Sequence, residues 1–362
     1  MKVSLRLESE MRLLIVGLAL VHCVFGKAAD KLLSVQVLFR HGERTPIATY
    51  PNDPYNNILF QETESGQLTN VGKMHQYKLG QWLRGRYNDF LSTRYSRNEI
   101  LVYSSDVDRV HMSAQCNLAG LYPPQGDQIW NQTLLWQPIP VHINVSILEG
   151  TVTNCPRYDA LKKTVDNSEK IQAVLAQYQE ELAYMSFHSG LNITDLNTLV
   201  LLRDTLYRED WGGLPLPAWT SQIYPNPINE LAALAFAQDT STTEIAKLSI
   251  GSFLNTVLQN FLNPAQKFVM YSGHDSLVSD VMHVLEPDYE NFCPEFASMV
   301  MFELWQGSKN QYVRFYLKRN DTVENLVVKK CSEKCVLSKF KTILETVAIS
   351  PDTKKKLCEI LP

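Results

Sequence analysis

The sequence has little excess charge of either sign, and it shows neither internal repeats nor low-complexity tracts. Its 34 lysines and arginines against 38 aspartates and glutamates give a formal net charge of −4 over 362 residues. Such a chain has no overall positive field that would attract nucleic acid or an anionic membrane surface. We therefore expect no nucleic-acid partner. Any binding of an anion must come from cations that gather locally.

Long hydrophobic runs are scarce as well. The apolar stretch Leu13 to Phe25 follows Lys2, Arg6 and Arg12 and precedes small residues. It is too short to span a bilayer, which takes about 20 residues. A cleaved signal peptide over residues 1–26 is therefore favoured over a membrane anchor. We expect a secreted, extracellular mature chain with no membrane anchor, in a venom or another secretion; the lysosomal lumen is the less favoured location.

Cysteines are few, and Cys23 falls within the predicted signal peptide. An even number in the remaining, exported chain favours disulfides, although the sequence leaves the pairing open. Cys331 and Cys335 are close enough in sequence to close a short loop by themselves. A zinc site at this pair is disfavoured, because neither a histidine nor a second close cysteine pair lies nearby. The six candidates are Cys116, Cys155, Cys293, Cys331, Cys335 and Cys358.

Four Asn-X-Ser/Thr tripeptides are present. Each is weak evidence alone, but in an exported chain they become candidate glycosylation sites on surface loops. The candidate asparagines are Asn131, Asn144, Asn192 and Asn320.

The first third of the predicted mature chain alternates between strand and helix patterns. Ser34 to Phe39 is a short apolar run with β-branched residues, which predicts a buried strand. Val71 to Tyr87 has an apolar face typical of a helix, Glu99 to Ser104 resembles the next strand, and Arg109 to Leu121 the next helix. This order predicts a parallel α/β sheet.

The pattern changes after Cys155. Helical patterns over 158–184, 195–207 and 229–237 predict a mostly helical insertion at 156–243 that covers the sheet. Trp211 and Trp219 are candidates for lining a substrate pocket in this insertion, and ordinary core packing is at least as good an explanation.

Strand patterns then return. The segment 267–271 continues the sheet, and the segments 299–305 and 312–317 form a closing antiparallel hairpin. We therefore assign 30–155 and 244–362 to one α/β catalytic domain.

Charged segments follow three of the predicted strands. Because parallel sheets bind ligands at the carboxyl ends of their strands, the three segments can converge on one site. They are Arg40 to Pro46, Ser105 to Arg109 and Ser272 to Asp275.

That site would bring three arginines and two histidines close together. Cations gathered in this way repel one another unless an anion lies between them. The planar fork of arginine suits phosphate oxygens better than a lysine would. The residues Arg40, His41, Arg44, Arg109 and His274 therefore predict a phosphate pocket.

Each segment also has a simpler explanation. An Arg-His pair after a strand is often a solvated turn, Asp106 and Asp108 can cap the next helix, and His274 can open a helix with no chemical task. Three such coincidences at three strand ends are less probable than one shared site.

The same segments carry a family resemblance. Arg40-His41-Gly42-Glu43-Arg44-Thr45-Pro46 resembles the RHGxRxP signature of the histidine acid phosphatases, and His274-Asp275 resembles their distal HD pair. Similarity extends over almost all of the mature chain, towards prostatic and lysosomal members and the secreted, venom-type enzymes of insects. It implies a phosphoglycerate-mutase-like parallel-sheet core with helices on both faces and a smaller, mostly helical cap.

The resemblance also implies roles for the matching residues. His41 would attack phosphorus and form a phosphohistidine, and Asp275 would protonate the leaving group. The phosphoryl oxygens would be held by Arg40, Arg44, Arg109 and His274. No metal or other cofactor is implied, and Glu43 occupies a variable position that should not affect the chemistry.

The cysteines match the family in part. Pairs Cys155 with Cys358 and Cys331 with Cys335 resemble two bridges of the mammalian enzymes. Cys116 and Cys293 are additions to that pattern, and we hypothesise that they pair with each other.

The resemblance implies a secreted acid phosphatase acting on small phosphomonoesters. A specialised phosphatase of phytase or lysophospholipid type on the same fold is the first alternative. A catalytically silent secreted antigen or binding protein is the second, and the presence of all six site residues disfavours it. The mammalian relatives suggest a homodimer.

Overall fold

The computed structural model describes residues 29–56, 64–286, 289 and 292–360. The predicted signal peptide lies outside them. Among the described residues the strands are β1 (Lys31–Arg40), β2 (Ile100–Ser104), β3 (His142–Ile143), β4 (Phe268–Gly273), β5 (Met299–Gln306), β6 (Gln311–Arg319), β7 (Thr322–Leu326) and β8 (Cys335–Val336). The α-helices are α1 (Asn70–Arg86), α2 (Asp108–Leu121), α3 (Val145–Leu148), α4 (Pro156–Asp166), α5 (Glu169–Gln177), α6 (Gln179–Ser189), α7 (Leu196–Trp211), α8 (Ile228–Ala237), α9 (Thr243–Ser249), α10 (Gly251–Leu262), α11 (Asp275–Leu285), α12 (Leu337–Leu344) and α13 (Pro351–Cys358). Short 3-10 helices are η1 (Gly126–Gln128), η2 (Ala218–Gln222) and η3 (Gln238–Thr240).

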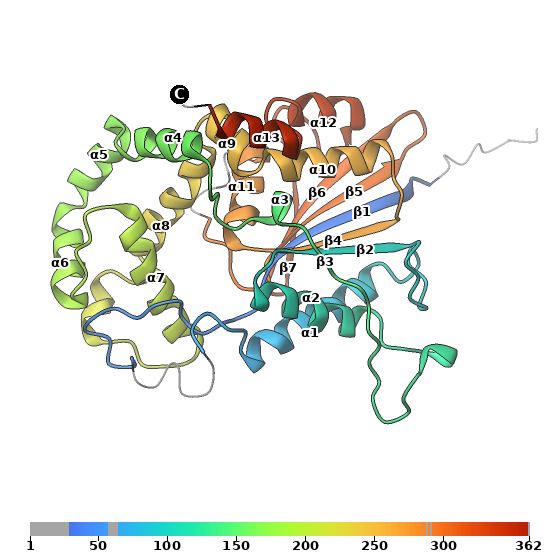
Figure 1. Ribbon diagram of the computed structural model, residues 1–362, viewed down its shortest axis with the longest axis horizontal. Helices are drawn as coiled ribbons and strands as arrows, with labels where there is room; N and C mark the ends of the chain where they lie inside the picture. Colours follow the sequence, from blue (N-terminus) through green and yellow to red (C-terminus); the bar gives the residue numbers. More distant parts are fainter. Residues whose placement is uncertain (1–28, 57–63, 287–288, 290–291, 361–362) are drawn as a thin grey trace, which may run out of the picture.

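A mixed sheet with the strand order β3-β2-β4-β1-β5-β6-β7 forms the centre of the molecule, and β8 pairs with β6 (Figure 1). Strands β3, β2, β4 and β1 are parallel to one another, and β1 is antiparallel to β5. Strands β5 and β6 form the predicted antiparallel hairpin next to β1. The predicted order of strands and helices is therefore confirmed. The carboxyl ends of β1, β2 and β4 meet at one edge of the sheet.

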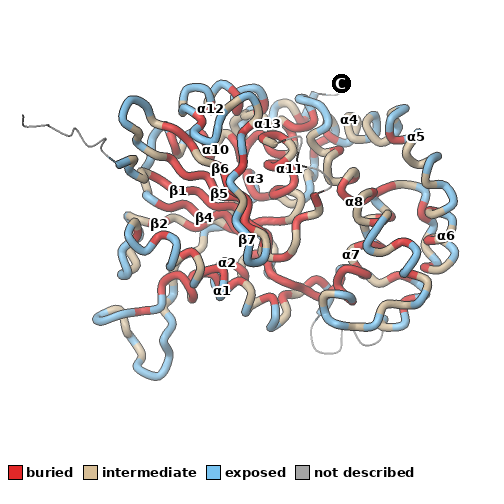
Figure 2. Tube along the Cα trace, turned by 180° about the vertical axis from the view of Figure 1, so that it is seen from behind, coloured by how far each residue is buried: buried red, intermediate tan, exposed pale blue. Residues whose placement is uncertain are grey.

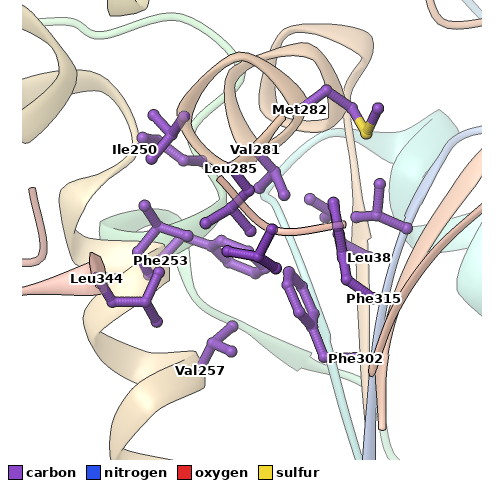
Figure 3. Close-up of a cluster of buried hydrophobic side chains, with 14 of the residues drawn as sticks. Leu38, Ile250, Phe253, Val257, Val281, Met282, Leu285, Phe302, Phe315 and Leu344 are labelled. Atoms are coloured by element: carbon purple, nitrogen blue, oxygen red, sulfur yellow. The ribbon is translucent and has the colours of Figure 1, made fainter. Parts of the chain in front are cut away.

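Strand β1 lies inside the sheet and alternates between two apolar layers. Val37 and Phe39 pack in the cluster that includes Leu83 of α1 and Leu118 of α2. Leu38 faces the other cluster, where α10, α11 and α12 cover the sheet (Figure 3). Both faces of the sheet are thus buried, as Figure 2 shows by the red strands between the helical layers. This double cover explains why the β1 sequence reads as a continuous apolar run.

Helices α4 to α8 lie beyond the carboxyl edge of the sheet, in the predicted insertion (Figure 1). Their apolar cluster includes Leu199, Leu202 and Leu206 of α7 and Ile228 of α8. The helical stretch predicted over 158–184 is interrupted: α4, α5 and α6 are separate helices. Ser168 caps α5 by accepting from the Ile171 amide, which starts a new helix there. The division into two domains stays a prediction.

Two of the three hypothesised disulfides are present, Cys155–Cys358 and Cys331–Cys335. The third was wrong, because Cys116 and Cys293 are free thiols. Cys116 lies on α2 in the helical layer over the sheet, whereas Cys293 packs against the cluster of α7 and α8. The Cys293 Sγ instead donates to the Asn229 carbonyl oxygen at 3.5 Å.

Candidate active site

Backbone pairing joins two of the predicted segments directly. β1 and β4 run in parallel with Arg40 opposite Gly273, and the His41 amide donates to the Gly273 carbonyl oxygen at 3.0 Å. His274 then caps α11 and Asp275 begins it. The register of the two strands therefore places Arg40 and His41 beside His274 and Asp275.

Arg40 lies fully buried beneath the site. Its Nη1 donates to the Pro294 carbonyl oxygen at 2.6 Å, and its Nη2 lies 2.6 Å from Oδ2 of Asp275. The guanidinium also stacks over the Phe296 ring at 4.2 Å. These contacts fix the orientation of a buried positive charge directly behind His41 and Asp275.

The hydrogen bonds of His41 define which ring nitrogen carries the proton. Its Nδ1 lies 2.8 Å from the Gly42 carbonyl oxygen, which can only accept, so Nδ1 holds the hydrogen. The Arg109 Nε donates to His41 Nε2 at 3.3 Å, so Nε2 presents its lone pair. His41 is thus a neutral imidazole whose nucleophilic Nε2 faces Arg109. Arg109 belongs to α2, which lies beside the end of β1 (Figure 1).

His274 is positioned by two residues that sequence reasoning missed. Its Nε2 lies 3.0 Å from Oγ of the buried Ser105. Gly150 packs against the ring so closely that a Cβ there would lie 2.5 Å from the His274 ring carbons. The His274 and His41 rings are 5.9 Å apart and nearly perpendicular. Gly150 carries no signal in the sequence, because the contact joins segments far apart in the chain.

Arg44 is held by a helix of the insertion. Its Nη1 and Nη2 donate to the two carboxylate oxygens of Asp204 at 2.9 and 3.0 Å. One turn later on α7, Arg208 donates to Oε1 of Glu43 at 2.8 Å, and both side chains are about 6% exposed. We call these two pairs the α7 clamp. The sequence suggested no partner for Glu43, and no pattern in it links residues 43 and 44 to α7.

Asp275 lies between a helix N-terminus and the arginines. Its Oδ1 accepts from the Ser276 amide at 2.9 Å, and its side chain is 25% exposed. Burial raises the pKa of this carboxyl, but the charges of Arg40 and Arg44 outweigh burial and leave the pKa below its usual value. In the ligand-free protein Asp275 is therefore a carboxylate.

Burial and mutual repulsion also shift the cations and histidines. Burial, then Arg40 and Arg109, hold the pKa of His41 well below its usual value. Burial lowers the pKa of His274 to about 4, partly opposed by Asp275. Burial and Arg44 lower the pKa of Arg109 to about 10. All three shifts have the sign of a site with excess positive potential, which a bound anion would relieve.

A cavity of about 750 Å³ opens from these residues towards α4, α7 and α8. His41, Arg44, Arg109, His274 and Asp275 line it, and Arg40 lies behind them, so all six predicted site residues come together. Neither Trp211 nor Trp219 lines this cavity. Their rings pack against other rings, Trp211 against Phe296 and Trp219 against His188, so core packing is the better explanation for both.

In the part of the chain that the structure describes, no group of three or more His, Cys, Asp or Glu side chains is arranged to hold a metal ion. Within those same residues no helix has the length and apolar character needed to cross a membrane.

Comparisons with known proteins agree with the geometry. Prostatic acid phosphatase of Rattus norvegicus is 35% identical over 336 residues, which cover 88% of this chain and 87% of the relative. Lysosomal acid phosphatase of Bos taurus is also 35% identical, over 88% of this chain and 78% of the relative. The solved phytase of Citrobacter braakii superposes with a TM-score of 0.70 at 16% identity, covering 91% of this chain and 100% of that chain. Residues 31–318 match the model of the histidine phosphatase superfamily (branch 2), and the chain belongs to that family.

Proposed function

We propose that this chain is an acid phosphatase that hydrolyses phosphate monoesters through a phosphohistidine formed on His41. The observation that carries the proposal is the neutral His41, whose Nε2 lone pair faces the cavity among three arginines. The acid phosphatase relatives and the family support the reaction class. At 16% identity the phytase neighbour shows the fold alone, and nothing in the cavity favours phytase activity over the main proposal.

The first step forms a bond between Nε2 of His41 and phosphorus while the bond from phosphorus to the ester oxygen breaks. A histidine of ordinary pKa would be protonated in acid and could not attack. Because burial and the arginines lower the pKa of His41, the imidazole stays neutral and nucleophilic in acid where an ordinary histidine is protonated. The low pKa of the nucleophile thus supports turnover at acidic pH.

The phosphoryl oxygens bind to Arg40, Arg44, Arg109 and His274 in this proposal. Arg109 donates to His41 in the ligand-free protein, and the phosphoryl group would take over this donor as it approaches Nε2. Positive charge already fixed at the site stabilises the transition state without reorganisation. Once Arg109 has turned to the phosphoryl group, the Nε2 lone pair of His41 is free for in-line attack.

Asp275 would donate the proton to the departing ester oxygen and then help a water molecule to attack the phosphohistidine. It is a carboxylate in the ligand-free protein because Arg40 and Arg44 lower its pKa against burial. A bound phosphoryl group neutralises those arginines, so the effect of burial prevails and the pKa rises. Substrate binding itself therefore protonates the donor, most readily at acidic pH.

The test compares wild type with His41→Ala on p-nitrophenyl phosphate across pH, with acid-quench trapping of the phosphoenzyme in both. We expect turnover below neutral pH, trapped phosphoprotein in the wild type only, and no loss on adding a metal chelator. Undiminished hydrolysis by His41→Ala would refute the nucleophile.

Asp275 is tested by the leaving group. Asp275→Asn should slow alkyl phosphates far more than p-nitrophenyl phosphate, because nitrophenolate leaves without a proton. Equal slowing of both esters would count against Asp275 as the proton donor. His274→Ala is the matched comparison and should slow both esters alike.

Secretion and glycosylation belong to the proposal as well. The two disulfides are consistent with an extracellular or lumenal protein. Of the glycosylation candidates, Asn192 and Asn320 are exposed, and Asn131 and Asn144 are partly exposed. Mass spectrometry of the protein expressed in a eukaryotic secretory host should find cleavage near residue 26 and glycans on the two exposed asparagines.

A homodimer remains a prediction. The edge strand β3 and the preceding loop expose apolar side chains, with Trp130 at 59% and Leu135 at 66% exposure. Light scattering should give twice the chain mass for the wild type and a monomer for Leu135→Asp. A wild-type monomer at micromolar concentration would refute the prediction.

A further inference from the structure

The cavity continues well past the proposed catalytic residues. Beyond them it is bounded by α3, α4, α7 and α8, and we call this part the distal lobe. Its apolar wall includes Val145, Val152, Leu201 and Phe236. Val145 and Leu201 are each 52% exposed, so their methyl groups are accessible to a molecule in the cavity. A leaving group attached to a phosphate bound at the arginines would lie against this wall.

The charges of the distal lobe are opposite in sign to those of the phosphate end. The acidic residues Glu149, Asp159 and Asp239 line it, and Asp106 lines the same cavity from the loop between β2 and α2. Glu149 is ion-paired with Lys354, and burial raises the pKa of Asp239, so the free negative charge belongs to Asp106 and Asp159. Glu149 accepts from the Thr153 amide, and Asp239 accepts from the Tyr158 hydroxyl. Among the described residues, the carboxylates of Asp106 and Asp159 make neither an ion pair nor a hydrogen bond, and both residues are exposed.

Two cations, Lys162 and Arg203, also line the lobe, and neighbouring side chains hold both in place. Lys162 Nζ lies 2.5 Å from Oδ1 of Asp166 and donates to Gln238 Oε1 at 3.0 Å. Arg203 is 6% exposed, and its Nε donates to Asn229 Oδ1 at 2.8 Å. Lys162 is thus neutralised by Asp166, and Arg203 is fixed in place by Asn229 and by the Tyr207 ring 4.3 Å away. The carboxylates of Asp106 and Asp159 also line the cavity, and neither is ion-paired there.

We propose that the distal lobe selects among phosphate monoesters by the charge of the leaving group. It accepts apolar leaving groups that are neutral or cationic, and it rejects those with a second anionic group. This deepens the proposed function and rests on it, because the phosphoryl group must first be held at the arginines.

The physical basis is Coulomb repulsion inside a partly enclosed cavity. An anion some 6 Å from a carboxylate in a medium of effective dielectric about 40 is disfavoured by roughly tenfold in binding. A cation at the same place is favoured by a similar factor. Added salt should weaken both effects, because the lobe is open to solvent.

The experiment uses three aryl phosphates that differ only in the para group: aminomethyl, ethyl and carboxymethyl. The three phenolate leaving groups have similar basicity, so the intrinsic reactivity of the three esters is similar. Differences in kcat/KM therefore measure how the distal lobe interacts with the para group. For the wild type at pH 5.5 we expect the aminomethyl ester to equal or exceed the ethyl ester. The carboxymethyl ester should fall about tenfold below the ethyl ester. Inositol hexakisphosphate should be poorer still.

Neutral variants then assign the effect to residues. In Asp106→Asn/Asp159→Asn the carboxymethyl ester should recover to within about threefold of the ethyl ester. The control Asp89→Asn removes an exposed carboxylate outside the cavity and should keep the tenfold difference.

Two results would overturn the proposal. One is equal kcat/KM for the carboxymethyl and ethyl esters in the wild type. The other is a difference that the double variant leaves unchanged. If all three esters are hydrolysed alike and hydrolysis is lost in His41→Ala, only the selectivity fails. If no ester is hydrolysed, the proposed function itself fails.

Discussion

The sheet and the helices α4 to α8 position the site by different means. On the sheet side, backbone pairing between β1 and β4 places Arg40, His41 and His274 within one register. On the helical side, α7 reaches the same loop only through side chains, the ion pairs of the α7 clamp. Many backbone hydrogen bonds together maintain the register of β1 and β4, whereas the α7 clamp consists of only two ion pairs between four residues. The sheet therefore positions the proposed catalytic residues, and α7 holds Glu43 and Arg44 and forms part of the cavity wall.

The largest expected effect is on stability, in the buried half of the α7 clamp. Arg208→Met leaves Glu43 as an unpaired charge in a site where both side chains are about 6% exposed. Removing one partner of a buried pair costs about 3–5 kcal/mol of unfolding free energy. Chemical denaturation measures this loss.

The control is the exposed pair between Lys341 and Glu345 on α12, whose side chains are 45% and 55% exposed. Lys341→Met should cost less than about 1 kcal/mol. If Arg208→Met costs no more than Lys341→Met, the clamp does not hold the helices to the sheet.

The next effect falls on the sheet side, at the ring of His274. Gly150→Ala would place a Cβ 2.5 Å from the ring carbons, so the ring must leave Ser105. We expect kcat/KM to fall about a hundredfold, a loss of about 2.7 kcal/mol in transition-state stabilisation. Gly85→Ala meets nothing within 4 Å and should be active. Full activity of Gly150→Ala would contradict a fixed position for His274.

The other half of the clamp should act on activity more than on stability. Asp204→Asn keeps the shape of the side chain but removes the charge that holds both Nη atoms of Arg44. We expect about a tenfold lower kcat/KM, which corresponds to about 1.4 kcal/mol, with a nearly unchanged melting temperature. Asp210→Asn, on the same helix but bonded to Tyr224, should be active. Equal losses in both variants would mean that α7 is merely destabilised.

The smallest effect concerns pH and stability on the helical side. Burial, then the neighbouring Asp53, raise the pKa of Glu209 to about 8. A raised carboxyl pKa means that the folded state binds an extra proton, so its stabilisation is complete in acid and is lost as pH rises to about 8. The wild-type melting temperature should fall by roughly 5 °C from pH 5 to pH 8.

Glu209→Gln should reduce that slope, and Glu180→Gln, at an exposed position on α6, should not. Some slope will remain in Glu209→Gln, because Asp280, buried near Asp239, also has a raised pKa. A slope identical to wild type in Glu209→Gln would show that the Asp53–Glu209 pair does not store a proton.

Much of the fold was predictable because its signals are local. The β-branched, apolar run of β1 and the apolar face of α1 are each read from residues a few positions apart, and the structure has both elements. The helical pattern over 158–184 is present in the structure, but it did not show where one helix ends and the next begins, as at Ser168, which caps α5. The predicted pairing of Cys116 with Cys293 was wrong, because the number of cysteines does not show which of them are close together in the fold.

By itself, the sequence determined the chemical groups of the site: a histidine beside arginines after one strand and a His-Asp pair after another. Strand ends of a parallel sheet must meet at one edge, so short motifs were enough to bring these groups together. Only the tertiary structure decided the proton position on His41, the α7 clamp, the role of Gly150 and the charge of the distal lobe. The α7 clamp and the contact of Gly150 with His274 join residues more than a hundred positions apart. The proton position on His41 depends on how its ring is oriented between Gly42 and Arg109. Neither kind of contact leaves a periodic pattern in the chain.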